Sequence, residues 1–334
     1  MIHPRIKQAI QIVISLVIAV WIFWFLYKDI ELDSLLKQIF SSNWAWIGLS
    51  MLIALTGYWL RGWRWTLLIS DQEGKKVSAG NAYHAVMVGY LANMIVPRAG
   101  EVARCGVLNR TNGQSIGHLL GTVIVERTID LVFLIATIFL SFLVENELFL
   151  ALANQLVNLE SLGEKIIQNL PVVLGGGLIF ILAFYFLLKR FRDHGLIQKI
   201  QHFLREMYSG IKGISKLKNP AGFWTSSVVI WIIYFLTMYT VSLGIQSTAN
   251  LSPGEVLLVM VMGSIGMVAP VQGGIGTFHA LVAFILIQLG ISEQDSKIFA
   301  AIIHGTQVIL VVVAGLISWI VMMQKQVGNK PQEA

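Results

Sequence analysis

The sequence predicts an all-α polytopic membrane protein with about six full spans plus two re-entrant helical hairpins in an inverted-topology repeat. Hydrophobic residues make up 56% of the 334 residues and charged residues 13%, whereas soluble domains carry about 25% charged residues. Several apolar runs reach the roughly 20 residues that cross a bilayer, and two further apolar segments are interrupted by proline and glycine. We therefore expect one membrane domain over residues 1–334, with pseudo-repeats at about 8–144 and 171–323.

The first half of the chain predicts full spans separated by one interrupted segment. The full spans are expected at about residues 8–27, 44–66 and 115–144. The first run ends without the small-residue cleavage site of a signal peptide, so we expect the chain to retain it. The interrupted segment, residues 81–96, stops at Pro97 and Gly100, because proline ends a helix and glycine loosens it. A second short helix is expected from Gly100 to Arg110.

The second half repeats this order. Its full spans are expected at about residues 171–188, 223–245 and 297–323. A short apolar segment, residues 255–269, stops at Pro270, and a second short arm follows over about 277–289. Each half therefore places an interrupted hairpin after two spans and before one.

The distribution of charge predicts the orientation. The net charge is +6, and the basic residues lie in short segments beside apolar runs, above all in residues 189–218, so these segments are expected in the cytoplasm. With both termini cytoplasmic in a plasma (inner) membrane, residues 81–110 must return to the cytoplasmic side and residues 255–290 to the outer side. A shared M-x-x-P-x-x-G motif, at Met94 and at Met267, supports this inverted repeat.

Charged residues at membrane depth form two clusters that are candidates for function. They are Arg98, Glu101 and Arg104 at the first break, and Glu126, Arg127 and Asp130 in the following long helix. A charge at the bilayer centre costs about 2.5–3.5 kcal/mol on insertion scales, so each needs a partner or a ligand. The arginines could bind the phosphate of a lipid headgroup, because guanidinium groups fit phosphate in a bidentate geometry. Alternatively, the two clusters pair with each other and pin the hairpin to the long helix.

The remaining candidates carry weaker signals. Gly273, Gly274 and Gly276 permit either direct headgroup contact or close helix packing. His279 and His304 are either proton-coupling residues or buried structural histidines, while Arg61 and Arg64 are expected to reach the cytoplasmic interface as basic anchors. No metal-binding or nucleotide-binding motif is present, so we expect no metal and no cofactor.

Four motifs together resemble the lysylphosphatidylglycerol synthase transmembrane (flippase-like) family. They are R-G-W-R-W from Arg61, P-R-A-G-E-V-A-R from Pro97, E-R-T-I-D from Glu126 and P-V-Q-G-G-I-G from Pro270. The resemblance covers nearly the whole chain and implies a membrane domain that flips lipids. Relatives fuse this domain to an aminoacyltransferase; because the chain ends at Ala334, we expect a stand-alone member. The chain departs from the family at His279, where many members carry an acidic residue.

The sequence thus favours a lipid translocase or lipid-binding transporter for an anionic-headgroup lipid in a bacterial plasma membrane. The expected partner is a membrane phospholipid, a glycolipid or a polyprenyl-phosphate lipid, and not nucleic acid. Two alternatives stay open: an integral-membrane transferase with Glu126 or Asp130 as base, and an accessory scaffold for lipid or glycolipid modification. A homo-oligomer and a lipid-modifying enzyme partner also stay open.

Overall fold

A computed structural model describes residues 16–17, 20–28, 30, 32–69, 76–148, 150, 212–269 and 271–328. The regular secondary structure of this part of the chain is helical throughout, without strands. The expected span at 171–188, the basic segment up to residue 211 and half of the expected first span lie outside the described residues, as does Pro270.

The helices of the first half confirm the expected order and add one short helix. They are α2 (Leu32–Ser41), α3 (Trp44–Ile69), α4 (Ala79–Ile95), α5 (Gly100–Asn112) and α6 (Ile116–Val144). The Ser78 hydroxyl caps α4 by accepting a hydrogen bond from the Asn81 N–H. Gly113, with a φ of 68°, ends α5 in the left-handed conformation that glycine adopts without strain. The short helix α2 was not expected.

The second half is described from residue 212 onward. Its elements are α11 (Pro220–Gly244), α12 (Pro253–Val268), the 3-10 turn η1 (Gln272–Gly274), α13 (Thr277–Gln288) and α14 (Glu293–Gly328). A capping box between Ser252 and Glu255 starts α12, and an Asn219 cap followed by Pro220 starts α11. The starts of α11 and α12 thus follow from local sequence signals.

Three helices in the described part of the chain are long and apolar enough to cross a membrane, namely Ile116–Val144, Pro220–Gly244 and Glu293–Lys325. A fourth candidate combines Leu35–Ser41 with Trp44–Ile69, although these two helices meet at an angle of 82°. The helices of the second hairpin are apolar but shorter. The chain is therefore a multi-pass helical membrane protein.

Glycines bring the two helices of each hairpin close together. A Cβ atom at Gly89 of α4 would lie 2.8 Å from the carbonyl oxygen of Gly100, at the start of α5. In the second hairpin, a Cβ at Gly266 would lie 2.8 Å from the backbone of Phe278. Each close approach carries one hydrogen bond: Gly100 N–H donates to Asn93 Oδ1 at 2.7 Å, and Thr277 Oγ1 donates to Gly266 O at 2.8 Å.

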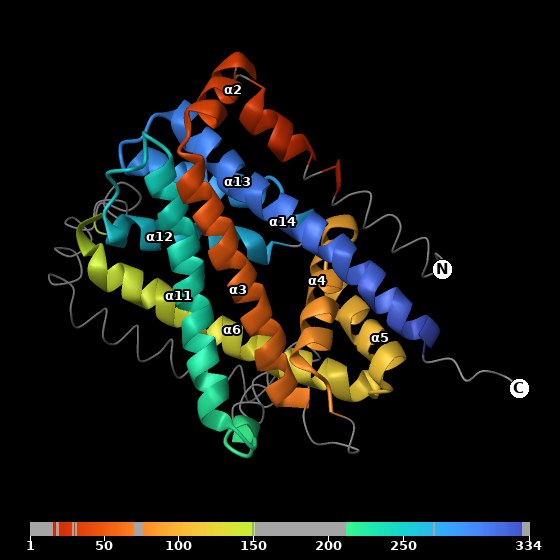
Figure 1. Cartoon of the computed structure of the whole chain (residues 1–334). Helices are drawn as coiled ribbons and strands as arrows, with labels where there is room; N and C mark the ends of the chain where they lie inside the picture. Colours follow the sequence, from red (N-terminus) through yellow and green to blue (C-terminus); the bar gives the residue numbers. More distant parts are fainter. Residues whose placement is uncertain are drawn as a thin grey trace, which may run out of the picture.

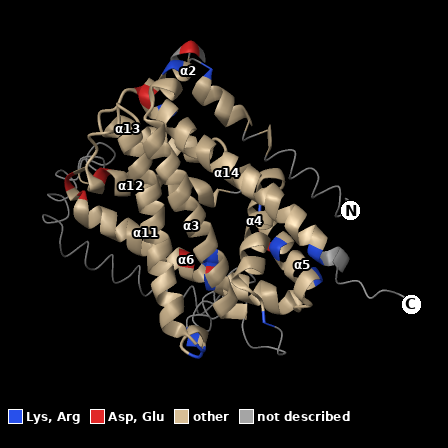
Figure 2. Cartoon of the chain, viewed as in Figure 1, with Lys and Arg blue, Asp and Glu red and all other residues tan. Residues whose placement is uncertain are grey.

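The long helix α3 lies at the centre of the bundle. It packs along α11 on one side and α4 on the other, and α14 runs along both α4 and α13 (Figure 1). Large apolar side chains such as Phe139 of α6 and Trp319 of α14 are exposed, as expected for a surface that faces lipid. Figure 2 shows basic residues near the start of α11 and the ends of α5 and α14, acidic residues near the start of α12, and both kinds near α2.

Candidate functional site

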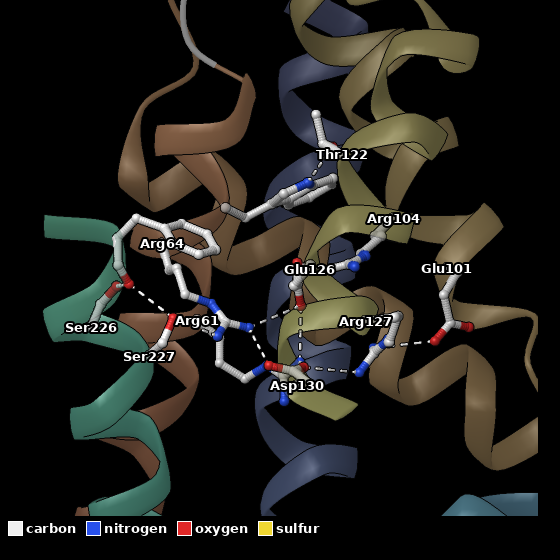
Figure 3. Close-up of polar contacts among 12 residues, drawn as sticks. Arg61, Arg64, Glu101, Arg104, Thr122, Glu126, Arg127, Asp130, Ser226 and Ser227 are labelled. Atoms are coloured by element: carbon white, nitrogen blue, oxygen red, sulfur yellow. Dashed lines mark hydrogen bonds and ion pairs between the residues drawn. The ribbon is translucent and has the colours of Figure 1, made fainter. Parts of the chain in front are cut away.

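A buried network of ion pairs surrounds Glu126, which is fully buried on α6. Its carboxylate accepts hydrogen bonds from Arg61 Nη2 at 2.9 Å and from Arg104 Nη1 at 3.1 Å, and it lies 3.7 Å from Arg64 Nη2 (Figure 3). Arg61 and Arg64 come from α3 and Arg104 from α5. One carboxylate therefore joins the central helix, the first hairpin and the long helix α6.

Asp130 lies one turn further along α6 and extends the network. It accepts from Arg61 Nη2 at 2.8 Å and from Arg64 Nη2 at 2.7 Å. Arg127 Nη1 lies 3.5 Å from Asp130, and Arg127 Nη2 lies 3.2 Å from Glu101. Figure 3 shows Arg127 between the carboxylates of Asp130 and Glu101. Because all seven groups are linked, a change at one alters the field at the others.

Neutral groups hold three of the arginines in place. Arg64 Nη1 donates to Ser227 Oγ of α11 at 3.1 Å, and Arg61 donates to the Tyr234 hydroxyl of the same helix. The Arg104 guanidinium carbon lies 4.4 Å from the centre of the Trp65 ring, a cation–π arrangement. Trp65 Nε1 in turn donates to Thr122 Oγ1 at 2.9 Å. Aromatic and hydroxyl groups thus orient charges that water would otherwise surround.

The prediction that Arg61 and Arg64 reach the cytoplasmic interface was wrong. Their exposed fractions are 7% and 0%, and they form the centre of the buried network. The two arginines lie three residues apart on one face of α3, and Glu126 and Asp130 lie four apart on one face of α6, so the charges meet in register. This complementary spacing is visible in the sequence and could have indicated the pairing.

The two charged clusters at the first hairpin and on α6 pair with each other, as one of the two alternatives expected. Arg104 pairs with Glu126 and Arg127 with Glu101, so the hairpin is pinned to α6. Arg98 lies apart from this network: its side chain is exposed, and its backbone has a φ of 60°. The structure therefore brings together every predicted residue of the two clusters except Arg98.

The network carries more positive than negative charge. Among the described residues it contains four arginines, Arg61, Arg64, Arg104 and Arg127, against three carboxylates, Glu101, Glu126 and Asp130. In that part of the chain, Arg104 Nε and Nη2 are buried and have no hydrogen-bond partner. Arg104 also lines a small cavity, together with Tyr90, Asn93, Glu101 and Arg127. The cavity has a volume of about 10 Å³, room for about one water molecule, so an anion would reach these guanidinium donors only if the surrounding helices moved apart.

The carboxylates of the network are poorly placed for base catalysis. Glu126 and Asp130 each accept from two guanidinium groups, so both oxygens of each carboxylate already accept a hydrogen bond from an arginine. A general base must lie within hydrogen-bond reach of the proton that it removes, so a substrate would have to compete with these arginines for the carboxylates. Among the described residues, no group of three or more His, Cys, Asp or Glu side chains could hold a metal ion.

The break of the second hairpin contains a pair of histidines that sequence reasoning did not connect. His279 of α13 and His304 of α14 are each 4% exposed, and their nearest ring nitrogens lie 3.4 Å apart. His304 Nε2 also lies 2.9 Å from the carbonyl oxygen of Gly273. Gly273, Gly274 and Gly276 all have positive φ values, between 55° and 87°, so the break needs glycine at each of these positions.

The two breaks touch. The methyl group of Met94, at the end of α4, would lie 2.6 Å from a Cβ atom at Gly273, so this glycine makes room for it. The 3-10 turn η1 packs against α4. Gly273 thus contacts the first hairpin, while Gly274 faces Met267 of its own hairpin.

A family model for the lysylphosphatidylglycerol synthase TM region matches residues 12–315. The chain belongs to this family. Comparison with curated proteins found no match, and comparison with solved structures found none either. The lysylphosphatidylglycerol synthase family is tied to membrane-lipid metabolism, which makes this chain a membrane protein of lipid modification or transport. The buried network and the two glycine breaks all lie within the matched residues.

Proposed function

We propose that this protein translocates, or binds for transport, a lipid with an anionic headgroup across the bacterial plasma membrane. The observation that carries the proposal is the buried network, in which four arginines face three carboxylates. Two guanidinium nitrogens of Arg104 have no partner among the described residues, and Arg104 lines a small cavity. A buried excess of positive charge is costly, and an anionic ligand offsets it. A phospholipid, glycolipid or polyprenyl-phosphate lipid supplies that charge on its phosphate.

In this proposal the first hairpin provides the headgroup site. Arg104 and Arg127 bind the phosphate, while Glu101, Glu126 and Asp130 hold the arginines in position. Gly273, Gly274 and Gly276 let the second hairpin approach this site, and His279 and His304 couple it to protons. Arg98 is exposed at the break, where it would meet the lipid as it enters.

The architecture in this proposal is an inverted repeat with about six spans and two re-entrant hairpins. Contact between Met94 and Gly273 supports it, because hairpins that enter from opposite sides meet near the membrane centre. The basic residues near the start of α11 and the ends of α5 and α14 support cytoplasmic termini, since Lys and Arg favour that side (Figure 2). Irregular backbone at this depth is tolerated where protein covers it, as Met94 covers Gly273.

Thiol accessibility tests the topology. In a Cys105→Ser background, single cysteines at Ser115 and at Gln294, both exposed, are probed on intact cells with a membrane-impermeant reagent. Opposite entry of the hairpins predicts labelling at Gln294 and none at Ser115. Labelling of the cysteine at Ser115 would contradict the inverted repeat. So would a cysteine at Gln294 that is labelled only after the cells are permeabilised.

Translocation of labelled lipid tests the function. Purified protein is reconstituted into phosphatidylcholine vesicles with a trace of fluorescent phosphatidylglycerol or fluorescent phosphatidylcholine, and dithionite bleaches the probe that reaches the outer leaflet. We expect faster translocation of the phosphatidylglycerol probe, because its net negative charge fits the arginine network. Equal rates for both probes, or no movement of either, would contradict the proposal. A new lipid product formed by pure protein with a donor would instead favour the transferase.

Two arginine variants and one control locate the site. Arg104→Gln removes the two guanidinium nitrogens that have no described partner. We expect it to lower the translocation rate of the phosphatidylglycerol probe at least about ten-fold, the effect of losing about 1.4 kcal/mol. Arg127→Gln changes a side chain that is 42% exposed, so it is the variant better tolerated by the fold. Arg110→Gln, an exposed arginine on the same hairpin helix, is the control and should leave the rate unchanged. If Arg104→Gln and Arg127→Gln translocate the phosphatidylglycerol probe as fast as the Arg110→Gln control, the proposed headgroup site is excluded.

A further inference from the structure

The histidine pair and the turn beside it share one closed chain of hydrogen bonds. Gly276 N–H lies 3.3 Å from His279 Nδ1, which therefore accepts. The proton of neutral His279 is thereby assigned to Nε2, which faces His304 Nδ1 at 3.4 Å. His304 must then carry its proton on Nε2, 2.9 Å from the carbonyl oxygen of Gly273. Every ring nitrogen is used, and the chain begins and ends on the same four-residue turn.

This chain of bonds exists only while both imidazoles are neutral. A proton added at His279 Nδ1 would face the Gly276 N–H, placing two donors against each other. A proton added at His304 can keep the bond between the rings only if His279 shifts its own proton to Nδ1, where it meets the same N–H. In each arrangement that keeps the rings bonded, Gly276 loses its acceptor.

The surroundings of the pair offer little to stabilise an added charge. Tyr27 is the titratable neighbour in the described residues: its ring lies 5.7 Å from the His279 ring, and its hydroxyl donates to the Lys297 carbonyl oxygen. Phe23 and Phe278 contact the rings from the N-terminal segment and from α13. From α4, α12, α13 and α14, no described Asp, Glu, Lys or Arg side chain contacts either imidazole. The neutral pair is thus sealed by aromatic rings.

We propose that His279 and His304 form a proton-binding latch that holds the Gly273–Gly276 turn closed while neutral and releases it when protonated. Release also frees Gly273 from Met94, so the latch acts where the two hairpins meet. Its use in driving lipid movement rests on the proposed function, whereas the latch itself does not. Proton binding would then alter how the second hairpin contacts the first.

Linkage gives the size of the effect. An imidazole exposed to water takes up a proton near about pH 6.5, and the closed latch excludes that proton. Opening therefore becomes more favourable as pH falls below that value. The ratio of open to closed turn rises roughly ten-fold for each pH unit and for each proton taken up. Between about pH 7.5 and about pH 5.5, uptake of one proton raises the open population roughly ten-fold.

Hydrogen exchange followed by mass spectrometry tests the latch without any transport assay. The full-length protein in lipid nanodiscs is exchanged at about pH 7.5 and about pH 5.5, with times scaled for the intrinsic pH dependence of exchange. Peptides covering residues 271–280 report the Gly276 amide, and peptides from the middle of α12 are the internal control. We expect roughly ten-fold faster corrected exchange at the lower pH in residues 271–280 and no change in α12. Unchanged protection of residues 271–280 would overturn the proposal.

Histidine variants assign the effect to the pair. His279→Gln and His304→Gln should each reduce the pH dependence of residues 271–280, and the double variant should abolish it. His84→Gln is the matched control, because His84 bonds to Ser318, about four turns along α14 from His304, and should leave that dependence intact. Persistence of the full pH dependence in the double variant would also overturn the latch. If exchange in residues 271–280 depends on pH but the protein translocates no lipid, the proposed function is refuted and the latch is not.

Discussion

Replacing Glu126 by glutamine tests whether the buried network stabilises the fold. The substitution keeps the size of the side chain and removes a charge that three arginines share, at 2.9 Å, 3.1 Å and 3.7 Å. The described network then changes from four positive and three negative groups to four and two. Breaking a buried ion pair by removing one partner costs about 3–5 kcal/mol, because the remaining charge stays buried.

The expected loss lies at the lower end of that range. The glutamine oxygen can still accept one of the two guanidinium hydrogen bonds, and Asp130 still neutralises part of the charge of Arg61 and Arg64. We therefore expect a loss of about 3 kcal/mol. With about 2 °C for each kcal/mol in a chain of this size, the apparent melting temperature should fall by roughly 6 °C.

The protein contains its own reporter for this measurement. Cys105 is the sole cysteine of the chain and is fully buried beside Arg104, so a dye that becomes fluorescent on reaction with thiols follows unfolding in detergent. Glu147→Gln, on the exposed surface just after α6, is the control for a changed glutamate. Melting of Glu126→Gln within about 1 °C of the unmodified protein would refute the account of the network. The double variant with Arg104→Gln should lose less than the sum of the single losses.

Three further predictions use the same melting assay. Gly100→Ala should lower the melting temperature because its Cβ would overlap the α4 backbone, whereas Gly106→Ala meets nothing within 4 Å and should not. Arg98→Gly should raise stability by about 1 kcal/mol because Arg98 has a φ of 60°; a fall would mean that its side chain stabilises the fold. Burial and the negative charge of Glu255 raise the pKa of Glu145 above its usual 4.5, so stability is lost as pH rises through that raised value. Glu145→Gln should therefore raise the melting temperature at neutral pH and leave it unchanged below about pH 4; a gain that persists in acid would contradict this reasoning.

Helix positions in the described part were predictable because their signals are local. The span expected at 115–144 is observed at Ile116–Val144, since an apolar run sets its length and polar residues end it. The breaks were predictable because proline and glycine act on the turn in which they occur. The short helix α2 was missed because its ten residues mix apolar and charged side chains, a pattern that predicts a surface helix rather than a span.

The partners of the buried charges were not predictable from local signals. Basic residues at the end of an apolar run normally mark an interface, which is why Arg61 was placed there. Its partner Glu126 lies 65 residues away in the sequence, and only the packing of α3 against α6 brings the two together. The contact of His279 with His304 has the same origin, because these histidines lie 25 residues apart on different helices.

The location of the charges within the chain bears on how the protein could move. All the ion pairs of the network join residues between 61 and 130, so they lie within the first half. The contacts from this network to α11 are hydrogen bonds to neutral groups, from Arg64 to Ser227 and from Arg61 to Tyr234, and a cation–π contact of Arg64 with Phe223. A neutral partner contributes about 1 kcal/mol, or up to about 3 kcal/mol when it bonds a charged group. Separation of α11 from α3 would therefore leave each buried charge with its carboxylate or guanidinium partner, and would break the weaker bonds first.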